Sequence, residues 1–283
     1  MVYKKWLWGG VALAGAGMLL NALFLEQYFF EVKRFTIGNV AQGQKRLRLL
    51  LLTDLHLKQV AKRHQKLASK INELAPDLIL IAGDAVDGKV TSIAPLQEFL
   101  AMLDISCQKV AIMGNHDHLT RAASLEEFCS AYRAYNCHLL VNQTIVLKIK
   151  GERVVITGLD DCIEGNGNVP KAVADIGQEK HHFLLAHSPN QHEQAIKQIS
   201  RINESRSADQ KIRLGYGFAG HNHGGQVRLP WYIPMLPAHN GDYVNGWYYD
   251  KKPYVYVSKG YGTSKIPVRF GARAEITLFE YMV

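Results

Sequence analysis

The chain has 283 residues, of which 47% are hydrophobic and 20% are charged. This length and composition fit a globular catalytic domain with ample core, and they exclude a largely disordered chain. Its 33 lysines and arginines outnumber its 25 acidic residues, which gives a formal net charge of +8. No arginine–aromatic pattern or nucleic-acid-binding motif accompanies this excess, so nucleic acid is not an expected partner.

The N-terminal residues predict a membrane anchor. Residues 6–25 are apolar except for Asn21, and at helical rise 20 residues span roughly 30 Å, the thickness of a bilayer core. A cleavable signal peptide is the alternative, but the sites that resemble its cleavage motif fall inside the apolar run. We therefore expect residues 1–30 to hold an uncleaved transmembrane helix and residues 31–46 to form a linker. Basic residues nearly balance on its two sides, so they do not set its orientation.

The segment after the anchor is strongly basic. Ten basic residues and one acidic residue, Asp54, lie between Lys33 and Lys70. Such a stretch suits anionic lipid head groups or a phosphorylated substrate, although a solvated helix face is the ordinary explanation for any single lysine. The four cysteines contain no Cys-x-x-Cys pair and are expected to be free thiols.

From residue 47 onward, apolar runs alternate with amphipathic segments. In the first half the predicted elements are strands at 47–53, 77–82 and 109–113 and helices at 61–74, 93–103 and 125–135. In the second half they are a hairpin from 144–150 and 153–158, strands at 182–186, 215–219, 254–258 and 274–281, and a helix at 190–199. Apolar strands separated by helices indicate sheets with helical cover. The prediction is one α/β catalytic domain, residues 47–283, with two sheets face to face and helices outside.

Five short blocks of metal-ligating side chains follow these apolar runs. They are Asp54-Leu55-His56, Gly83-Asp84, Gly114-Asn115-His116-Asp117, His187 and Gly220-His221-Asn222-His223. Sites in open α/β sheets form where strands end, so five strand ends can bring these side chains to one point. A lone Asp after a strand usually caps a helix, and a lone His is usually a surface or core residue. The joint occurrence of the blocks outweighs these separate explanations.

The predicted ligands suit two divalent metal ions. The seven are Asp54, His56, Asp84, Asn115, His187, His221 and His223, with Asp84 as the candidate bridge. Oxygen and imidazole donors without a thiolate favour manganese, with iron, zinc, cobalt or magnesium as alternatives. Two such ions roughly 3.5–4 Å apart activate water and neutralise charge in phosphoester hydrolysis. The remaining histidines considered are expected outside the site: His64, His138, His181, His182 and His192.

Three residues beside the ligands have predicted supporting or catalytic roles. His116 follows Asn115 directly, so it is the candidate catalytic residue that protonates the leaving oxygen or stabilises the transition state. Asp117 is expected to orient His116, with a helix cap as the alternative. Asp87 is expected to support the ligands or to form a turn.

The substrate-binding residues remain open. The segment from Arg228 to Lys252 is rich in aromatic residues and closely follows His223. We expect it to overhang the metals and hold acyl chains, stack a base or enter a membrane interface; a minor core under a long loop is the alternative. Further along, Lys265, Arg269 and Arg273 are candidates for phosphate contacts.

The blocks, with Asp87 completing Gly83-Asp84-x-x-Asp87, resemble the signature of the calcineurin-like metallophosphoesterases. The resemblance implies a four-layer α/β/β/α sandwich around a di-metal site, with His116 as the catalytic histidine. It implies one metal on Asp54, His56, Asp84 and His223 and the other on Asp84, Asn115, His187 and His221. Protein serine/threonine phosphatases usually carry Arg after the second Asp of the second block and Glu after the His of the third. Gly88 and Asp117 at those positions argue against a phosphoprotein substrate.

Gly224-Gly225-Gln226, together with the anchor, resembles a bacterial membrane-anchored branch of this family. That branch includes phosphodiesterases and the UDP-2,3-diacylglucosamine pyrophosphatases of lipid A synthesis. The similarity implies a single-pass protein of the bacterial inner membrane that releases lipid X and UMP at the cytoplasmic face. Its expected partners are the phospholipid bilayer and an acylated nucleotide sugar, with no protein partner. A phosphodiesterase or phosphatase of broader specificity and a non-catalytic membrane scaffold are the alternatives.

Overall fold

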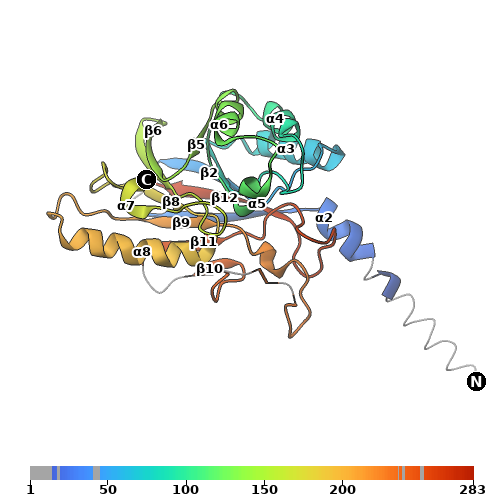
Figure 1. Ribbon diagram of the computed structural model, residues 1–283. Coiled ribbons are helices and arrows are strands. Elements are labelled where there is room, and N and C mark those ends of the chain that lie inside the picture. The colour runs from blue at the N-terminus through green and yellow to red at the C-terminus, as the bar shows by residue number, and fades with distance from the viewer. Residues whose placement is uncertain (1–14, 18–19, 41–44, 235, 238–239, 249–251) are drawn as a thin grey trace, which may run out of the picture.

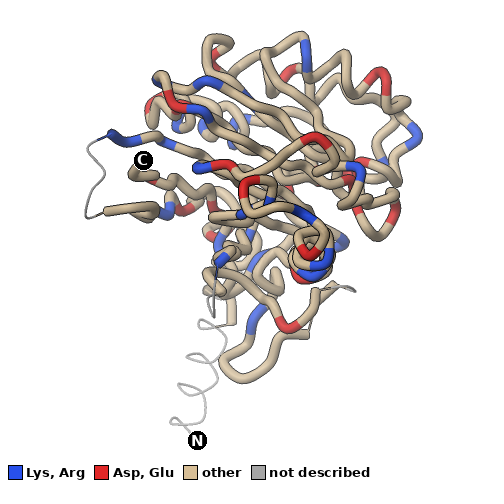
Figure 2. The backbone as a smooth tube through the Cα atoms, turned by 90° about the vertical axis from the view of Figure 1, so that its left-hand side faces the viewer, with Lys and Arg blue, Asp and Glu red and all other residues tan. Residues whose placement is uncertain are grey.

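Two six-stranded sheets form the centre of the molecule, and helices lie on their outer faces (Figure 1). The computed structural model describes residues 15–17, 20–40, 45–234, 236–237, 240–248 and 252–283. Figure 2 shows that lysines and arginines are interspersed with acidic residues along this part of the chain.

The first sheet has the strand order β1-β12-β2-β3-β4-β5. Its strands are β1 (Glu31–Gly38), β2 (Arg46–Leu52), β3 (Leu78–Ala82), β4 (Gln108–Ile112), β5 (Cys137–Leu140) and β12 (Glu275–Met282). Strands β2 to β5 are parallel, whereas β12 is antiparallel to β2 and parallel to β1. Every residue of β3 is buried, as expected for a parallel strand covered on both faces.

The second sheet has the order β10-β11-β9-β8-β7-β6. Its strands are β6 (Gln143–Ile149), β7 (Glu152–Gly158), β8 (His182–Leu185), β9 (Tyr216–Ala219), β10 (Gly246–Tyr248) and β11 (Tyr254–Val257). The predicted hairpin is confirmed: β6 and β7 pair antiparallel across Lys150 and Gly151. Both turn residues have left-handed backbones, with φ of 50° and 85°, which matches the strand twist in a tight hairpin.

The longer helices cover the outer faces of the sheets. They are α3 (Lys62–Leu74), α4 (Ala94–Ala101) and α6 (Leu125–Arg133) on the first sheet and α8 (Pro189–Glu204) on the second, where the four-residue α7 (Val169–Ala172) joins it. The short elements are η1 (Asn21–Leu25), α2 (Glu26–Tyr28), α5 (Asn115–Leu119) and η2 (His223–Gly225). In α3, Leu67, Ile71 and Leu74 recur at helical spacing and are buried, which explains how this helix packs.

Successive side chains along β2 point to opposite faces of the first sheet and so contribute to two separate hydrophobic cores. Leu49 and Leu51 of β2 point into the core between the sheets, where they join Phe183 of β8. Leu50 and Leu52 point the other way, into the core under the helices. A strand buried on both faces needs apolar residues at every position, and this accounts for the continuous leucine run. The layers follow in the order helix, sheet, sheet, helix, an α/β arrangement as expected.

The predicted linker at residues 31–46 is wrong for its first half. Residues 31–38 are strand β1, which pairs with β12 along its whole length. Phe35 and Ile37 pack into the core between the sheets, while the alternate positions are more exposed. The half-exposed edge strand therefore carries a polar pattern that resembles a linker. The folded domain begins before residue 47, since Glu26 and Gln27 are also buried.

The transmembrane prediction falls mainly on residues beyond those the structure describes. Residues 6–14 and 18–19 of the predicted span are outside the described ranges. Within those ranges, no helix is both long enough and apolar enough to cross a bilayer.

Candidate metal centre

The five blocks meet at one edge of the two sheets. Each begins just after a parallel strand: Asp54 after β2, Asp84 after β3, Asn115 after β4, His187 after β8 and His221 after β9. Because these strand ends face the same way, their loops converge. The structure brings all seven predicted ligands together; six are buried, and Asn115 is half-buried.

The backbone at these blocks is strained. Five predicted ligands have a left-handed φ, namely Asp54 (53°), His56 (45°), Asp84 (52°), His221 (68°) and His223 (49°). Such conformations cost of order 1–3 kcal/mol each in non-glycine residues and gather at functional sites. Gly83 permits the close approach of the blocks, because a Cβ there would lie 2.6 Å from Nδ1 of His187. The fold therefore maintains a conformation that the local sequence disfavours.

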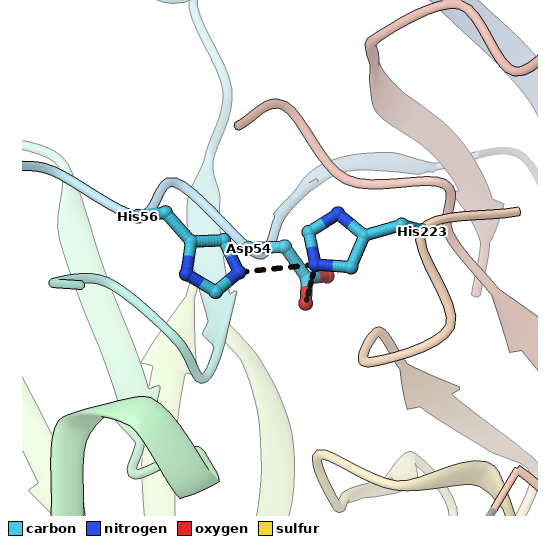
Figure 3. A group of neighbouring side chains, drawn as sticks. All are labelled: Asp54, His56 and His223. Carbon is cyan, nitrogen blue, oxygen red and sulfur yellow. Dashed lines mark hydrogen bonds and ion pairs between the residues drawn. The ribbon is translucent and has the colours of Figure 1, made fainter. Parts of the chain in front are cut away.

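One group of ligands consists of Asp54, His56 and His223, whose side chains point toward one another (Figure 3). Nε2 of His56 lies 3.0 Å from Nε2 of His223, which is 3.6 Å from Oδ1 of Asp54. Burial lowers the pKa of His56 to about 3 and also holds the pKa of His223 well below its usual range. Two neutral imidazoles and a carboxylate that converge in this way suit a divalent cation.

A second group contains Asp84 and His187, and Asp84 also lies beside His56 of the first group. Oδ2 of Asp84 lies 3.5 Å from Nε2 of His56 and 3.3 Å from Nε2 of His187. Nδ1 of His187 contacts the carbonyl of Ala82 at 2.8 Å, and this contact directs Nε2 toward Asp84. Oδ1 of Asn115 lies 3.1 Å from Nδ1 of His221. One carboxylate oxygen between two imidazoles fits a bridging ligand, so the clustered residues form a dinuclear site for divalent metals.

The charge state of His187 links metal binding to pH. Burial lowers its pKa, but the charges of Asp84, Asp54 and Asp161 and the contact with Asp84 together outweigh burial and raise the pKa to about 10. Burial, reinforced by the charge of Asp84, raises the pKa of Asp54 to about 6. In the absence of metal, His187 is therefore protonated at neutral pH, and it must lose this proton before Nε2 can bind an ion.

We expect the binding of manganese to release about one proton from His187 between pH 7 and 9. The affinity of that ion should therefore rise about tenfold per pH unit until the pKa of about 10 is passed. Below about pH 6 Asp54 is also protonated before the metal binds. Binding then releases a second proton, so the affinity should depend more steeply on pH. Calorimetric titration in buffers of different ionisation enthalpy measures the protons released. His187→Gln should abolish this release, and an affinity independent of pH would contradict the assignment.

His116 is held at the start of α5 with its ring beside His56. The two ring centroids are 4.5 Å apart and perpendicular. Its Nδ1 accepts a hydrogen bond from the Gly88 amide at 3.2 Å, so the proton of the neutral ring is on Nε2. That Nε2 lies 3.3 Å from Oγ of Ser264. Asp87 lies in the same cluster, with a carboxylate oxygen within 4.8 Å of ring nitrogens of His56 and His116.

Asp117 does not orient the His116 ring. Its buried carboxylate accepts hydrogen bonds from the amides of Gly114 and Val86, both at 2.9 Å. It is the third residue of α5 and caps that helix, which is the alternative role considered from the sequence. Burial raises its pKa to about 7. The carboxylate joins the loops that follow β3 and β4, and so fixes the spacing of Asp84 and Asn115.

A cavity of about 340 Å³ opens over the ligands. Its base contains Asp84, Asn115 and His221, and part of its wall is Pro234 and Leu236. The first half of the aromatic segment therefore overhangs the site, as expected. Its second half follows the alternative, because Trp247 packs on Phe35 and Phe279 in the core between the sheets. The five histidines expected elsewhere do not line this cavity.

Arg269 was a candidate for phosphate contact, and the structure contradicts this. Its side chain is fully buried behind the site and donates to the carbonyls of Gly262, Ala272 and Lys259 at 2.6–2.8 Å. Its Nη2 also lies 3.2 Å from Nδ1 of His223. The guanidinium therefore joins backbone segments around a predicted ligand. Sequence reasoning could not detect this role, because backbone carbonyls leave no motif.

The end of the predicted anchor supports the loop that carries Arg269. Glu26 accepts hydrogen bonds from the amides of Gly271 at 2.9 Å and Ala272 at 3.0 Å. Gln27 donates to the carbonyl of Pro267 at 2.7 Å, and the Arg269 amide donates to the carbonyl of Ala22 at 3.0 Å. Residues 22–27 are therefore part of the wall behind the metal centre. The sequence feature that could have indicated this role is the polar pair Glu26 and Gln27 directly after the apolar run.

We expect Glu26→Ala to lower the free energy of unfolding by about 2–4 kcal/mol, because the buried Ala272 amide and the part-buried Gly271 amide both lose a carboxylate acceptor. Urea unfolding of the purified chain measures the loss. Glu73→Ala is the matched control, since Glu73 is exposed and pairs only with Lys70 among the described residues. Equal stability of the two variants would show that residues 22–27 do not brace the domain.

Comparison with known proteins agrees with this geometry. The model of the calcineurin-like phosphoesterase family matches residues 47–225. The metallophosphoesterase YkuE of Bacillus subtilis (strain 168) is 28% identical over 278 residues, which cover 95% of this chain and 91% of that protein. A Danio rerio transmembrane protein with a metallophosphoesterase domain is 30% identical over 245 residues, which cover 82% of this chain and 52% of that protein. The chain belongs to the calcineurin-like phosphoesterase family and is a metal-dependent phosphoric ester hydrolase.

Proposed function

We propose that this hydrolase acts at a bacterial inner membrane and cleaves a phosphodiester or pyrophosphate bond, with UDP-2,3-diacylglucosamine as substrate and lipid X and UMP as products. The observation that carries the proposal is the cavity, which has the metal ligands at its base and Ile163, Pro234 and Leu236 among its apolar wall residues. A phosphate can reach the ligands while an apolar part of the substrate contacts the wall. A phosphodiesterase of broader specificity is the second candidate, because small diesters also fit.

The side chains divide the chemistry among them. When bound, two divalent ions, with manganese proposed first, supply an activated water nucleophile and neutralise phosphate charge. Asp84 would hold both metals, and its Oδ1 accepts a hydrogen bond from the His116 amide at 2.8 Å. His116 then presents its Nε2 proton to the cavity, since its Nδ1 is occupied by the Gly88 amide. This N–H donates a hydrogen bond to the leaving oxygen and stabilises the charge that forms there as the bond to phosphorus breaks. Full transfer of the proton needs a ring protonated on both nitrogens, in which the proton on Nδ1 replaces the Gly88 contact.

Exposed apolar side chains support the proposed membrane location. Trp231 is 87% exposed, and Phe24 and Phe29 are 51% and 64% exposed. Contacts link their segments: the Arg269 amide donates to Ala22, and the Arg228 amide donates to Phe270. Aromatic residues at such positions favour a lipid interface. We propose that residues 1–30 anchor the chain and that the cavity opens near the bilayer on the cytoplasmic face.

The test uses the full chain with manganese. Hydrolysis of bis-p-nitrophenyl phosphate reports the general activity, and release of UMP from UDP-2,3-diacylglucosamine in detergent micelles reports the proposed substrate. Hydrolysis of the small diester without UMP release would eliminate the lipid substrate and leave the broader phosphodiesterase. A chain that binds no metal and hydrolyses neither would be a scaffold. A reporter fused to the C-terminus tests the cytoplasmic location independently.

A further inference from the structure

We propose that Lys265 forms an anion subsite at the mouth of the metal cavity and binds a second phosphate in the leaving part of the substrate. The proposal rests on the proposed function and deepens it: it favours pyrophosphate diesters over diesters with an uncharged leaving group. Neither the predicted ligands nor His116 requires this residue, so the subsite is a separate feature of the chain.

The position of Lys265 places it on the leaving-group side. Lys265 and Ser264 line the same cavity as Asn115 and His116. Oγ of Ser264, the residue before Lys265, lies 3.3 Å from Nε2 of His116. Because the N–H of this nitrogen would face the leaving oxygen, the group attached to that oxygen would lie near residues 264–265. A phosphate there would face the lysine.

The charge of Lys265 is available to a ligand. Of the described residues that line the cavity, it is the only lysine or arginine. Lys259 is neutralised by Glu31 at 3.1 Å and Glu275 at 3.2 Å, whereas no ion pair forms at Lys265 in the described part of the chain. Arg269 is occupied by backbone carbonyls. Of the three cations proposed from the sequence, Arg269 is buried and Arg273 is exposed but does not line the cavity, so Lys265 alone is both exposed and on the cavity.

The turn that carries Lys265 is fixed on both sides by one buried side chain. Nε2 of Gln226 donates to the carbonyls of Ser264 at 3.0 Å and Ile266 at 2.9 Å, and its Oε1 accepts from the Ser264 amide at 2.8 Å. Lys265 has a left-handed φ of 57°. A non-glycine residue keeps this conformation only where its surroundings enforce it. Here Gln226 enforces it, which holds the lysine at the cavity.

The experiment compares UDP with UMP as inhibitors of bis-p-nitrophenyl phosphate hydrolysis, with manganese in excess. The two nucleotides differ by one phosphate. Lys265→Gln should raise the inhibition constant of UDP on the order of 10-fold, the effect of losing one charge-assisted hydrogen bond. The inhibition constant of UMP and kcat/KM for the small diester should change less than about twofold. Lys171→Gln, at an exposed position in α7, is the matched control.

Gln226→Leu separates position from charge, because it keeps the lysine and removes the three hydrogen bonds around it. It should reproduce the selective loss for UDP. Equal changes for UDP and UMP in Lys265→Gln, or no change for either, would overturn the subsite. If the unaltered protein does not hydrolyse the diester, the proposed function fails by itself. Calorimetric binding of UDP and UMP to the same variants then still decides the role of Lys265.

Discussion

Asp84→Asn is expected to lower kcat/KM for a phosphodiester by on the order of 1,000-fold or more, because both metal positions lose their shared anionic ligand. Oδ2 of this carboxylate lies between the Nε2 atoms of His56 and His187, at 3.5 and 3.3 Å. Asparagine keeps the size of the side chain but removes the charge. Metal content per chain, measured by mass spectrometry after dialysis, should fall together with the activity.

The control for this variant is Asp175→Asn, which changes an exposed carboxylate away from the cavity. We expect Asp84→Asn to lower the thermal stability of the metal-free protein, because it removes the buried carboxylate that pairs with protonated His187. The fold should survive in both variants, since His187 can then lose its proton. Thermal unfolding checks this point. A dialysed Asp84→Asn protein that keeps two metals and more than about a tenth of its activity would refute the bridging role.

The ligand blocks could be predicted because each follows a strand whose two faces are buried. In β3, five consecutive apolar residues precede Gly83 and Asp84, and this pattern predicts both the strand and the position where it ends. Parallel strands then bring their carboxyl ends to one edge without any further information. The order of the strands in the sheets was not needed to expect that Asp84 and His187 would meet.

The edge strand β1 could not be predicted, because only one of its faces is covered and its partner strand is distant in the sequence. Its partner is β12, about 240 residues later in the chain, and the register of Glu31 with Glu275 carries no local signal. One face of β1 is solvated, so Lys33 and Arg34 resemble linker residues. Tertiary pairing, rather than local preference, makes this segment a strand.

The hydrogen bonds that support the metal centre could not be predicted from the sequence either. Gln226 and Arg269 bind mainly backbone carbonyls and amides, and any residue type can supply those groups. Asp117 illustrates the limit directly: its place after His116 fits an orienting carboxylate and a helix cap equally. Only the start of α5 at Asn115 decides, because it puts Asp117 at the capping position.

His116→Gln is expected to separate proton donation from metal binding. Glutamine keeps polarity at the cavity but cannot donate a proton as an acid, so hydrolysis of a diester with an alkyl leaving group should slow by on the order of 100–10,000-fold. A p-nitrophenolate leaving group needs little protonation, and its release should slow much less. Both metals should be retained, since the seven ligands are unchanged and the His116 amide still reaches Asp84.

The measurement is kcat for a series of diesters of rising leaving-group basicity, with metal content determined on the same samples. His138→Gln, an exposed change in β5, should leave the whole series unaltered. A loss that grows with leaving-group basicity identifies His116 as the acid, acting from a ring whose Nδ1 carries a second proton in place of the Gly88 contact. An equal loss for every leaving group would mean instead that His116 stabilises charge on the phosphate, because only proton transfer depends on the basicity of the departing oxygen.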